Sequence, residues 1–296
     1  MATTTVTPAP AAKAPRGEVR EIIVHLVRDP LGLAGLVIIA LFVVSAVFAP
    51  WIAPYDPIEI DVLARLEGPS AAHLLGTDQL GRDTFSRVIW GGQVALRVAL
   101  PTIAGALLIG LVLGMIAGFG PRWLDSLIVL LFDTVRSFPT VMFALAVVAL
   151  VGPSLGTVIF VIMLTSIPTY GRVVRTQTLT LKRSEFILAE QSLGASVGRI
   201  LGVHVLPNVL GPLAVLAAMD IPTVVGLEAG LSFLGMGVKP PTPSWGSLLN
   251  DGYSLIRNTP WLIVAGGIPL ILITVGFTFL GEALRDVVDP KLRGQR

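Results

Sequence analysis

The stretch Leu31–Ala49, which reads LGLAGLVIIALFVVSAVFA, decides the fold class because it is apolar almost throughout and holds no charged side chain. A helix needs about 20 apolar residues to cross the hydrocarbon core of a bilayer. Pro50 follows directly, and the stretch is longer than the apolar core of a signal peptide. We therefore interpret it as an uncleaved membrane anchor.

The composition of the whole chain is also that of a membrane protein. Of its 296 residues, 53% are apolar and only 14% are charged, and the mean hydropathy is +0.82. A soluble domain has roughly 25% charged residues, so this chain could not cover a surface exposed to water. The net charge of +2 is too small to indicate a nucleic-acid partner. Three His and no Cys exclude thiolate metal sites, disulfides and haem attachment.

Five further apolar stretches predict an all-α, polytopic protein with six transmembrane helices. The fourth stretch is short for a span, and the third is long enough to tilt. Five stretches contain an internal proline, which neighbouring membrane helices can accommodate. The predicted spans are Leu31–Ala49, Leu96–Phe119, Leu124–Val151, Leu155–Tyr170, Val209–Leu231 and Trp261–Leu280.

The distribution of Lys and Arg predicts the orientation. Fourteen lie in the two tails and the second and fourth loops, whereas only five lie in the alternate loops 50–95, 152–154 and 232–260. Cytoplasmic loops carry the excess of basic residues, so both termini are expected in the cytoplasm. The predicted parts are a tail 1–30, a first helix with its outer loop 31–95, a five-helix domain 96–283 and a tail 284–296.

The cytoplasmic loop 172–207 is the strongest candidate for a functional segment, because unstructured loops of this length are uncommon in compact folds. Ser184 is placed to cap a helix, with Glu185 in the first turn. Pro207 would end a second helix as the next span begins. The hinge between the two helices is expected at Gly194, Ala195 and Ser196.

Apolar spacing indicates that both short helices are amphipathic. The residues concerned are Phe186, Ala189 and Leu193 in the first helix and Ile200, Leu201 and Val203 in the second. Periodicity alone leaves two interpretations open: a rigid knob presented to a cytoplasmic partner, or a pair of helices that only anchors the loop at the membrane surface.

The run Leu188–Gly194, followed by His204–Asn208, resembles the coupling motif of ABC importer permeases. That motif reads Glu-Ala-Ala-x-x-x-Gly, then a spacer and Ile-x-Leu-Pro. Gly194, Leu206 and Pro207 fall on this pattern, and Ala189 takes the place of the first Ala. Leu188 stands in place of Glu, Glu190 in place of the second Ala, and His204 in place of Ile. These departures affect polar contacts more than shape, which Gly and Pro determine.

Three other blocks resemble, in the same order, the C-type permease of dipeptide, oligopeptide and nickel importers. They are His73–Asp83 with Ser86 and Arg87 in the outer loop, Glu228–Val238 leading into Pro240–Gly246, and Gly281–Asp286 with Asp289–Arg293 at the end of the chain.

The resemblance implies a permease subunit that forms half of a pathway for di- and oligopeptides across the bacterial inner membrane. It implies as partners a homologous second permease in a heterodimer, two cytoplasmic ATPases and an extracytoplasmic solute-binding protein. ATP and Mg²⁺ would be bound by the ATPases, because this chain lacks the phosphate-binding loop Gly-x-x-x-x-Gly-Lys-Ser/Thr. We therefore expect that this chain has no enzymatic activity of its own and binds no cofactor.

The resemblance also implies that the loop docks on an ATPase. The residues expected to take part are Glu185, Phe186, Leu188, Ala189, Glu190, Ser192, Leu193, Gly194, Ala195, Ser196 and Pro207.

Charged residues inside the spans are candidates for the translocation path. Asp133 and Arg136 lie three residues apart, and we favour a structural ion pair between them. Asp220, Glu228 and Ser232 lie on the helix that resembles the pore-facing fifth span of the family. Neither carboxylate has an obvious partner in its own helix, so we expect one of the two to face the cavity.

Two outer features have plain structural interpretations. His73 beside Asp78 is a weak signal for a metal site, and a turn with a helix-capping Asp is favoured. Trp245 and Trp261 fit anchors at the outer membrane interface.

Two alternatives stay open. The same architecture could carry nickel, glutathione or another small solute. A stand-alone transporter driven by an ion gradient could use Asp133, Asp220 and Glu228 as a relay, although six spans, the lack of an evident inverted repeat and the large basic loop weigh against it.

Overall fold

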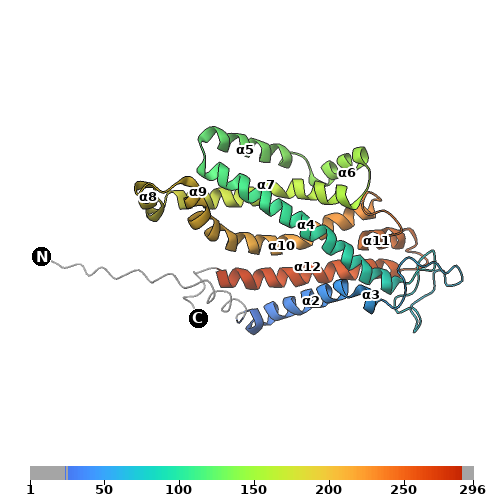
Figure 1. Ribbon diagram of the computed structural model, residues 1–296. Helices are drawn as coiled ribbons and strands as arrows, with labels where there is room; N and C mark the ends of the chain where they lie inside the picture. Colours follow the sequence, from blue (N-terminus) through green and yellow to red (C-terminus); the bar gives the residue numbers. More distant parts are fainter. Residues whose placement is uncertain (1–23, 25, 289–296) are drawn as a thin grey trace.

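The computed structural model describes residue 24 and residues 26–288, with side chains as far as Leu284. These residues form an all-α bundle (Figure 1) whose only β-type pairing is a single bridge between Thr77 and Asp83. Most of both predicted tails, including the block Asp289–Arg293, lies outside the described residues. The elements are α2 (Pro30–Val47), α3 (Ala49–Ile52), α4 (Thr84–Phe119), α5 (Arg122–Arg136), α6 (Thr140–Val151), α7 (Leu155–Lys182), α8 (Glu185–Ser192), α9 (Val197–Arg199), the π-helical η1 (Ile200–Val205), α10 (Leu206–Phe233), α11 (Trp245–Ser254) and α12 (Trp261–Val288).

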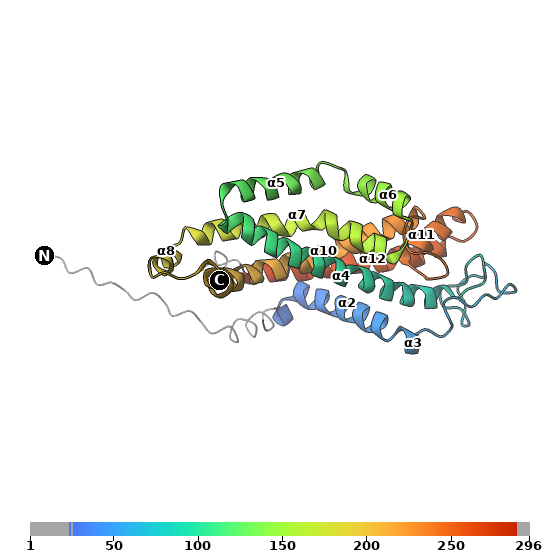
Figure 2. The ribbon, with the colours of Figure 1, turned by 45° about the horizontal axis from the view of Figure 1, so that its top comes forward.

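The long helices lie roughly along one axis, and the short elements gather at the two ends (Figures 1 and 2). At one end, here the α8 end, are α8, α9, the first residue of α2 and the last of α12. At the other, the α11 end, are α3, α11 and the segment that joins α3 to α4. Two of the three predicted outer loops, 50–95 and 232–260, therefore lie together, opposite the candidate functional segment.

The prediction of six spans is confirmed, with a correction to the third. Five described helices are long and apolar enough to cross a membrane, and α5 with α6 passes the same test as a pair. The pair is bent by 83°, so the stretch Leu124–Val151 is not one continuous helix. The break falls at Ser137–Pro139, because proline has no N–H to donate and disfavours a helical conformation in the residue before it.

Three helices extend beyond their apolar stretches. α4 begins at Thr84, ahead of Leu96, and α12 continues past Leu280. α7 continues to Lys182, so the first part of the predicted loop 172–207 is helix instead of loop. Hydropathy marks only the part of a helix that lies in lipid, and these polar extensions lie outside it.

Close packing of α4 against α7 forms the centre of the bundle. Gly110, Gly114 and Gly118 recur at every fourth residue and present one face to α7. A Cβ atom at Gly114 would lie 2.5 Å from the Gly171 carbonyl oxygen, and one at Gly118 would lie 2.6 Å from the Thr178 Cβ. Small residues at this spacing let two membrane helices approach closely.

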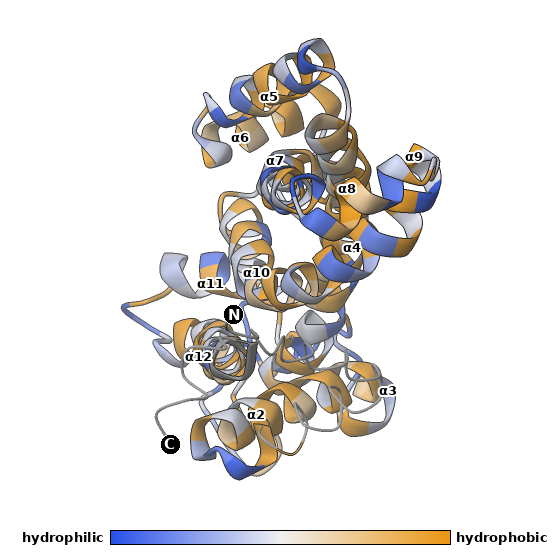
Figure 3. Cartoon of the chain, turned by 90° about the vertical axis from the view of Figure 1, so that its left-hand side faces the viewer, coloured by the Kyte–Doolittle hydropathy of each residue, from blue (hydrophilic) through white to orange (hydrophobic). Residues whose placement is uncertain are grey.

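The outward surface of the bundle is apolar. Seen along the helix axes (Figure 3), apolar residues cover much of α2 and α5. Leu41 on α2 is 66% exposed, and Leu130 on α5 is 61% exposed. Side chains of this kind suit a lipid environment.

Candidate coupling segment and translocation helix

The segment between α7 and α10, residues 184–205, is called the coupling segment below. Its first helix ends at Ser192, and Gly194 makes the turn with a φ of +81°. That conformation favours glycine, and it closes the helix because the Gly194 amide donates to the Gln191 carbonyl at 3.0 Å. α9 then begins at Val197. The turn lies where the sequence predicts a hinge.

The side chains of the coupling segment differ from the predicted amphipathic pattern. Ile187 is fully buried, whereas Phe186 is 47% and Leu193 is 85% exposed. All three side chains of the expected apolar face, Phe186, Ala189 and Leu193, are exposed, and the side chain of α8 that packs in the core is Ile187. In the second piece Ile200 is buried and Val203 is exposed. Three buried side chains, Ile187, Ile200 and Val205, anchor the segment, and Ala195 and Leu201 pack partly buried against the same core.

Two predictions about the ends of these helices also need correction. Ser184 occupies the N-cap position of α8, but its hydroxyl donates to the Leu181 carbonyl at 2.6 Å and caps no amide. Pro207 does not end a helix, because it lies in the first turn of α10, directly after the π-helical turn η1. η1 therefore runs into α10 without a break, and Val197–Phe233 forms one helical span.

Two of the three residues that depart from the coupling motif face each other. His204 Nε2 lies 3.6 Å from Glu190 Oε1, which joins α8 to η1. The Phe186 ring packs edge-on against the His204 ring, with centroids 6.0 Å apart. The sequence comparison marks both departures but does not show that they meet.

The two carboxylates of α10 both have partners. Tyr170 on α7 donates its hydroxyl to Asp220 Oδ2 at 3.1 Å, and Asp220 remains partly exposed. Glu228 is 1% exposed and accepts the Ser232 hydroxyl at 2.6 Å. The expectation that Glu228 lacks a partner in its own helix is wrong, since Ser232 lies one turn further on. Of the two, Asp220 is the one that a solute could reach.

The predicted pair between Asp133 and Arg136 does not form. Asp133 Oδ1 lies 2.5 Å from the Arg172 guanidinium, and Arg136 donates to the Thr169 hydroxyl at 3.2 Å. Because α7 extends beyond its apolar part, Arg172 lies beside α5 and pairs with Asp133 in place of Arg136. A second pair between the same helices, Asp125 with Arg175, was not predicted; it has two hydrogen bonds, of 2.5 and 2.8 Å.

At the α11 end, buried ion pairs fold the segment that precedes α4. Asp78 is fully buried and accepts from Arg82 Nε at 2.7 Å, while Arg87 NH1 lies 3.2 Å from its Oδ2. Asp251 on α11 lies 3.7 Å from Arg87 and 3.9 Å from Arg82. These four charges join the segment to α4 and α11. The one signal of this network in the sequence is that Asp78 and Arg82 are four residues apart.

His73 takes part in a capping arrangement. Its Nδ1 lies 2.9 Å from Asp83 Oδ1, and the other oxygen of Asp83 accepts the Ser86 amide at 2.7 Å, which caps α4. The capping aspartate is therefore Asp83, and Asp78 belongs to the ion pairs. Within the described residues no group of three or more His, Asp or Glu side chains could hold a metal ion.

Trp245 is not an interfacial anchor. It is 3% exposed, and its Nε1 donates to the Val88 carbonyl at 2.8 Å. The residue opens α11, a helix inside the predicted loop 232–260. Because Gly91 leaves room beside the indole ring, Trp245 packs against α4 instead of reaching the membrane surface.

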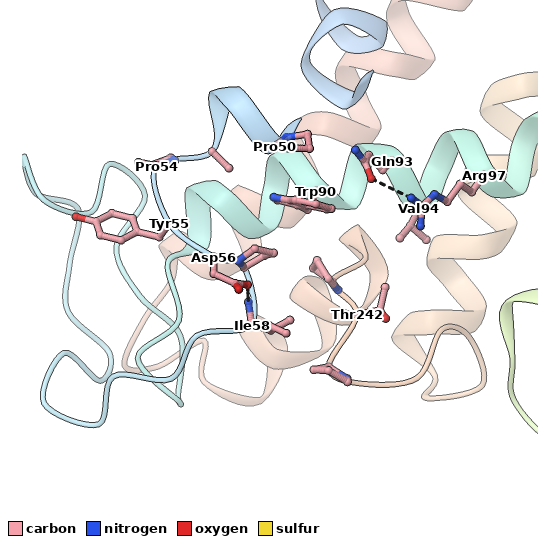
Figure 4. A pocket seen from close by; sticks show the side chains of 14 residues that line it. Pro50, Pro54, Tyr55, Asp56, Ile58, Trp90, Gln93, Val94, Arg97 and Thr242 are labelled. Carbon is pink, nitrogen blue, oxygen red and sulfur yellow. Dashed lines mark hydrogen bonds between the residues drawn. The ribbon is translucent and has the colours of Figure 1, made fainter. Parts of the chain in front are cut away.

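A pocket of about 640 Å³ opens at the α11 end (Figure 4). α4 contributes Trp90, Gln93 and Arg97, and residues Pro241–Pro243 of the loop before α11 form another wall. Residues Pro50–Ile58 contribute the remaining wall. Arg97 donates to Gln93 Oε1 at 3.3 Å.

Comparison with known proteins finds family models and relatives that match most of this chain. Residues 110–294 match the family model described as "Binding-protein-dependent transport system inner membrane component", and residues 19–69 match "N-terminal TM domain of oligopeptide transport permease C". The dipeptide transport system permease protein DppC of Alkalihalophilus pseudofirmus is 39% identical, over 93% of this chain and 90% of its own length. The di/tripeptide transport system permease protein DppC of Pseudomonas aeruginosa is 38% identical, over 88% of each chain.

A solved structure of the MetNI methionine ABC transporter in an inward facing conformation shares the fold. Its matching chain superposes with a TM-score of 0.57 at 18% identity, covering 69% of this chain and 97% of that chain. α2 and its connection to α4 precede the region that the first family model matches.

Proposed function

The chain belongs to the family of inner membrane components of binding-protein-dependent transport systems, and from this membership we propose that it forms half of an ATP-driven import pathway for di- and oligopeptides. The peptide cargo is supported by the names of the two relatives, which are 39% and 38% identical over most of the chain. No feature of the described residues favours nickel, glutathione or an ion-gradient mechanism over this cargo and energy source.

The proposed assembly contains this chain, a homologous second permease, two ATPases and an extracytoplasmic binding protein. Both termini and the α8 end lie in the cytoplasm, as the excess of Lys and Arg in the tails and near α8 indicates. ATP and Mg²⁺ are bound by the ATPases. The cargo reaches the α11 end from the binding protein.

The observation that carries the mechanism is the continuity of the coupling segment with α10. The exposed side chains of Phe186, Leu188 and Leu193 offer an apolar surface to an ATPase. Movement of that ATPase displaces the segment as a unit, because three of its side chains are buried in the core. η1 passes the displacement to α10 without a flexible joint.

The docking surface proposed here comprises the residues around the turn at Gly194. They are Glu185, Phe186, Leu188, Ala189, Glu190, Ser192, Leu193, Gly194, Ala195 and Ser196, with Pro207 at the start of the helix that moves.

Asp220 is the proposed contact for cargo on α10. Its carboxylate is partly exposed, and the Tyr170 hydroxyl holds it in place. A carboxylate at this position suits the terminal ammonium group of a peptide. Glu228 and Ser232 hold the outer end of α10 in shape. Asp133 and Arg136 are both exposed on α5, which packs against α4 and α7.

Replacement of Gly194 by valine tests the coupling. A β-branched residue at a φ of +81° is strained by about 1–2 kcal/mol, so we expect the intact turn to be about 5- to 30-fold less populated. Peptide uptake per ATP hydrolysed, measured in proteoliposomes of the whole complex with its binding protein, should fall accordingly. The matched control is Gly198→Val, since Gly198 lies in the same segment without a positive φ and with open space around it.

An unchanged ratio of uptake to hydrolysis in the Gly194→Val complex would contradict the coupling role. Uptake by the chain without any ATPase, abolished by an ionophore, would contradict the whole assignment and favour a transporter driven by an ion gradient.

A further inference from the structure

Arg97 is a charged residue in a membrane-spanning helix with little compensation. It is exposed, and within the described part of the chain its one hydrogen bond is the 3.3 Å contact to the neutral Gln93. Ionisable residues in membrane spans pair with another group or mark a functional site. The group that completes the environment of Arg97 must therefore come from outside the described residues.

The depth of Arg97 indicates which group this is. α4 has 36 residues, so it is about 54 Å long and exceeds the hydrocarbon core of about 30 Å. Arg97 lies about 20 Å along the helix axis from Thr84, at the outer end of the apolar stretch Leu96–Phe119. From there its long side chain reaches the layer of lipid head groups. Pro50, at the outer end of the first span, lines the same pocket.

The walls of the pocket also suit that layer. Trp90 and Tyr55 line it (Figure 4), and aromatic side chains with a polar edge gather at membrane interfaces. Asp56 lines the part nearer to water, and one of its carboxylate oxygens, Oδ1, accepts the Ile58 amide at 3.0 Å. The pocket thus has a cation on the membrane span, Arg97, and an anion on the loop after α3, Asp56.

Below Arg97, the exposed face of α4 is apolar for several turns. Leu100, Leu108 and Val112 are 58%, 60% and 51% exposed, and Ala104 lies between them on the same face. The spacing of three and four residues keeps them in one stripe. No side chain in this stripe could bind a peptide backbone, whereas a hydrocarbon chain fits along it.

We propose that this face binds an amine-bearing phospholipid of the outer leaflet. Arg97 holds the phosphate, Asp56 receives the head-group ammonium, and one acyl chain lies along the stripe from Leu100 to Val112. Phosphatidylethanolamine has this order of charges, with the phosphate nearer to the hydrocarbon and the amine nearer to water. The lipid neutralises Arg97 and closes the side of the pocket.

Native mass spectrometry of the assembled complex in mild detergent tests the proposal, with equimolar phosphatidylethanolamine, phosphatidylglycerol and phosphatidylcholine added. The wild-type complex should retain phosphatidylethanolamine over phosphatidylcholine by about fivefold. Arg97→Gln should weaken retention of all three lipids by about fivefold. Asp56→Asn should remove only the preference for the amine, so phosphatidylglycerol is retained as before.

Two matched variants control for general loss of charge. Arg257→Gln removes a cation and Glu59→Gln an anion, both exposed at the same end and outside the pocket, and neither should change retention. Ala104→Phe keeps the charges, blocks the stripe and should lower retention, which gives a second test if Arg97→Gln does not fold.

Equal retention of the three lipids by the wild type would overturn the proposal. So would equal losses in Arg97→Gln and Arg257→Gln. Release of the lipid by a dipeptide would overturn it in favour of a solute site. The first two outcomes do not depend on whether peptides are the cargo.

Discussion

The Ser232 hydroxyl joins two parts of the protein, because it donates to Glu228 at 2.6 Å and accepts the Val238 amide at 3.2 Å. Ser232→Ala leaves a buried carboxyl oxygen without its donor, which should lower the free energy of unfolding by about 1–3 kcal/mol. Thermal unfolding in mild detergent measures the change. Ser192→Ala, which removes an exposed hydroxyl bonded only to a helix carbonyl, should have an effect below about 0.5 kcal/mol. Equal shifts in both variants would contradict this role of Ser232.

At the residue scale, the sequence identified the important charges but not their partners. Asp133 and Arg136 share a helical face, yet Asp133 pairs with Arg172 on another helix. Spacing along one helix predicts which side chains are near neighbours on that helix, and it carries no information about the helix packed alongside. Asp78 and Glu228 show the same limit, since their burial depends on contacts made by distant segments.

Helix packing predicts that alanine at one glycine lowers the free energy of unfolding, whereas alanine at another glycine raises it. Gly114→Ala places a Cβ 2.5 Å from the Gly171 carbonyl oxygen and forces α4 away from α7, which should lower the free energy of unfolding by about 1–3 kcal/mol. Gly226→Ala on α10 adds a Cβ with nothing within 4 Å, and the better helix propensity of alanine should raise the free energy of unfolding by up to about 1 kcal/mol.

The two variants are compared by thermal unfolding in the same detergent. Stabilisation by Gly114→Ala would show that the two helices do not rely on this close approach.

At the element scale, the run Gly194–Ser196 predicted the turn, and apolar stretches predicted the number of spans. They did not predict where α4 and α7 end, because the polar extensions of these helices lie outside the lipid that hydropathy reports. Pro139 was visible as a possible interruption, but a proline inside a membrane helix is often tolerated, so the 83° bend could not be inferred from it. Gly110, Gly114 and Gly118 are spaced four residues apart, which indicates close packing of two helices. Hydropathy does not report this spacing.

The orientation of the whole molecule can be tested directly, because the chain contains no cysteine. Leu63→Cys, at the α11 end and 95% exposed in the wild type, should react with a membrane-impermeant maleimide added to intact cells. Thr180→Cys, exposed near the α8 end of α7, should react only after the membrane is opened. Labelling of Thr180→Cys in intact cells would reverse the proposed orientation.

At the scale of the molecule, the family and the all-α architecture followed from four short blocks of sequence in the right order, together with the apolar stretches. The pocket beside Arg97 did not follow, because its walls come from three segments far apart in the chain that only the folded bundle brings together. α11 escaped notice for a similar reason, since a short polar helix in a proline-rich loop has no apolar signature.

The ion pairs that Asp251 makes at the α11 end cannot form until late in the synthesis of the protein, because their members lie far apart in the sequence. Arg82 and Arg87 emerge early in translation, whereas Asp251 is added about 160 residues later, some 8–30 s at ordinary rates of synthesis. In the proposed orientation, the nascent chain exposes an incomplete cluster of charge outside the membrane during that interval. The final geometry of the first outer loop would then be set only after the last outer loop has crossed, so a chain truncated before α11 would leave this region unfinished.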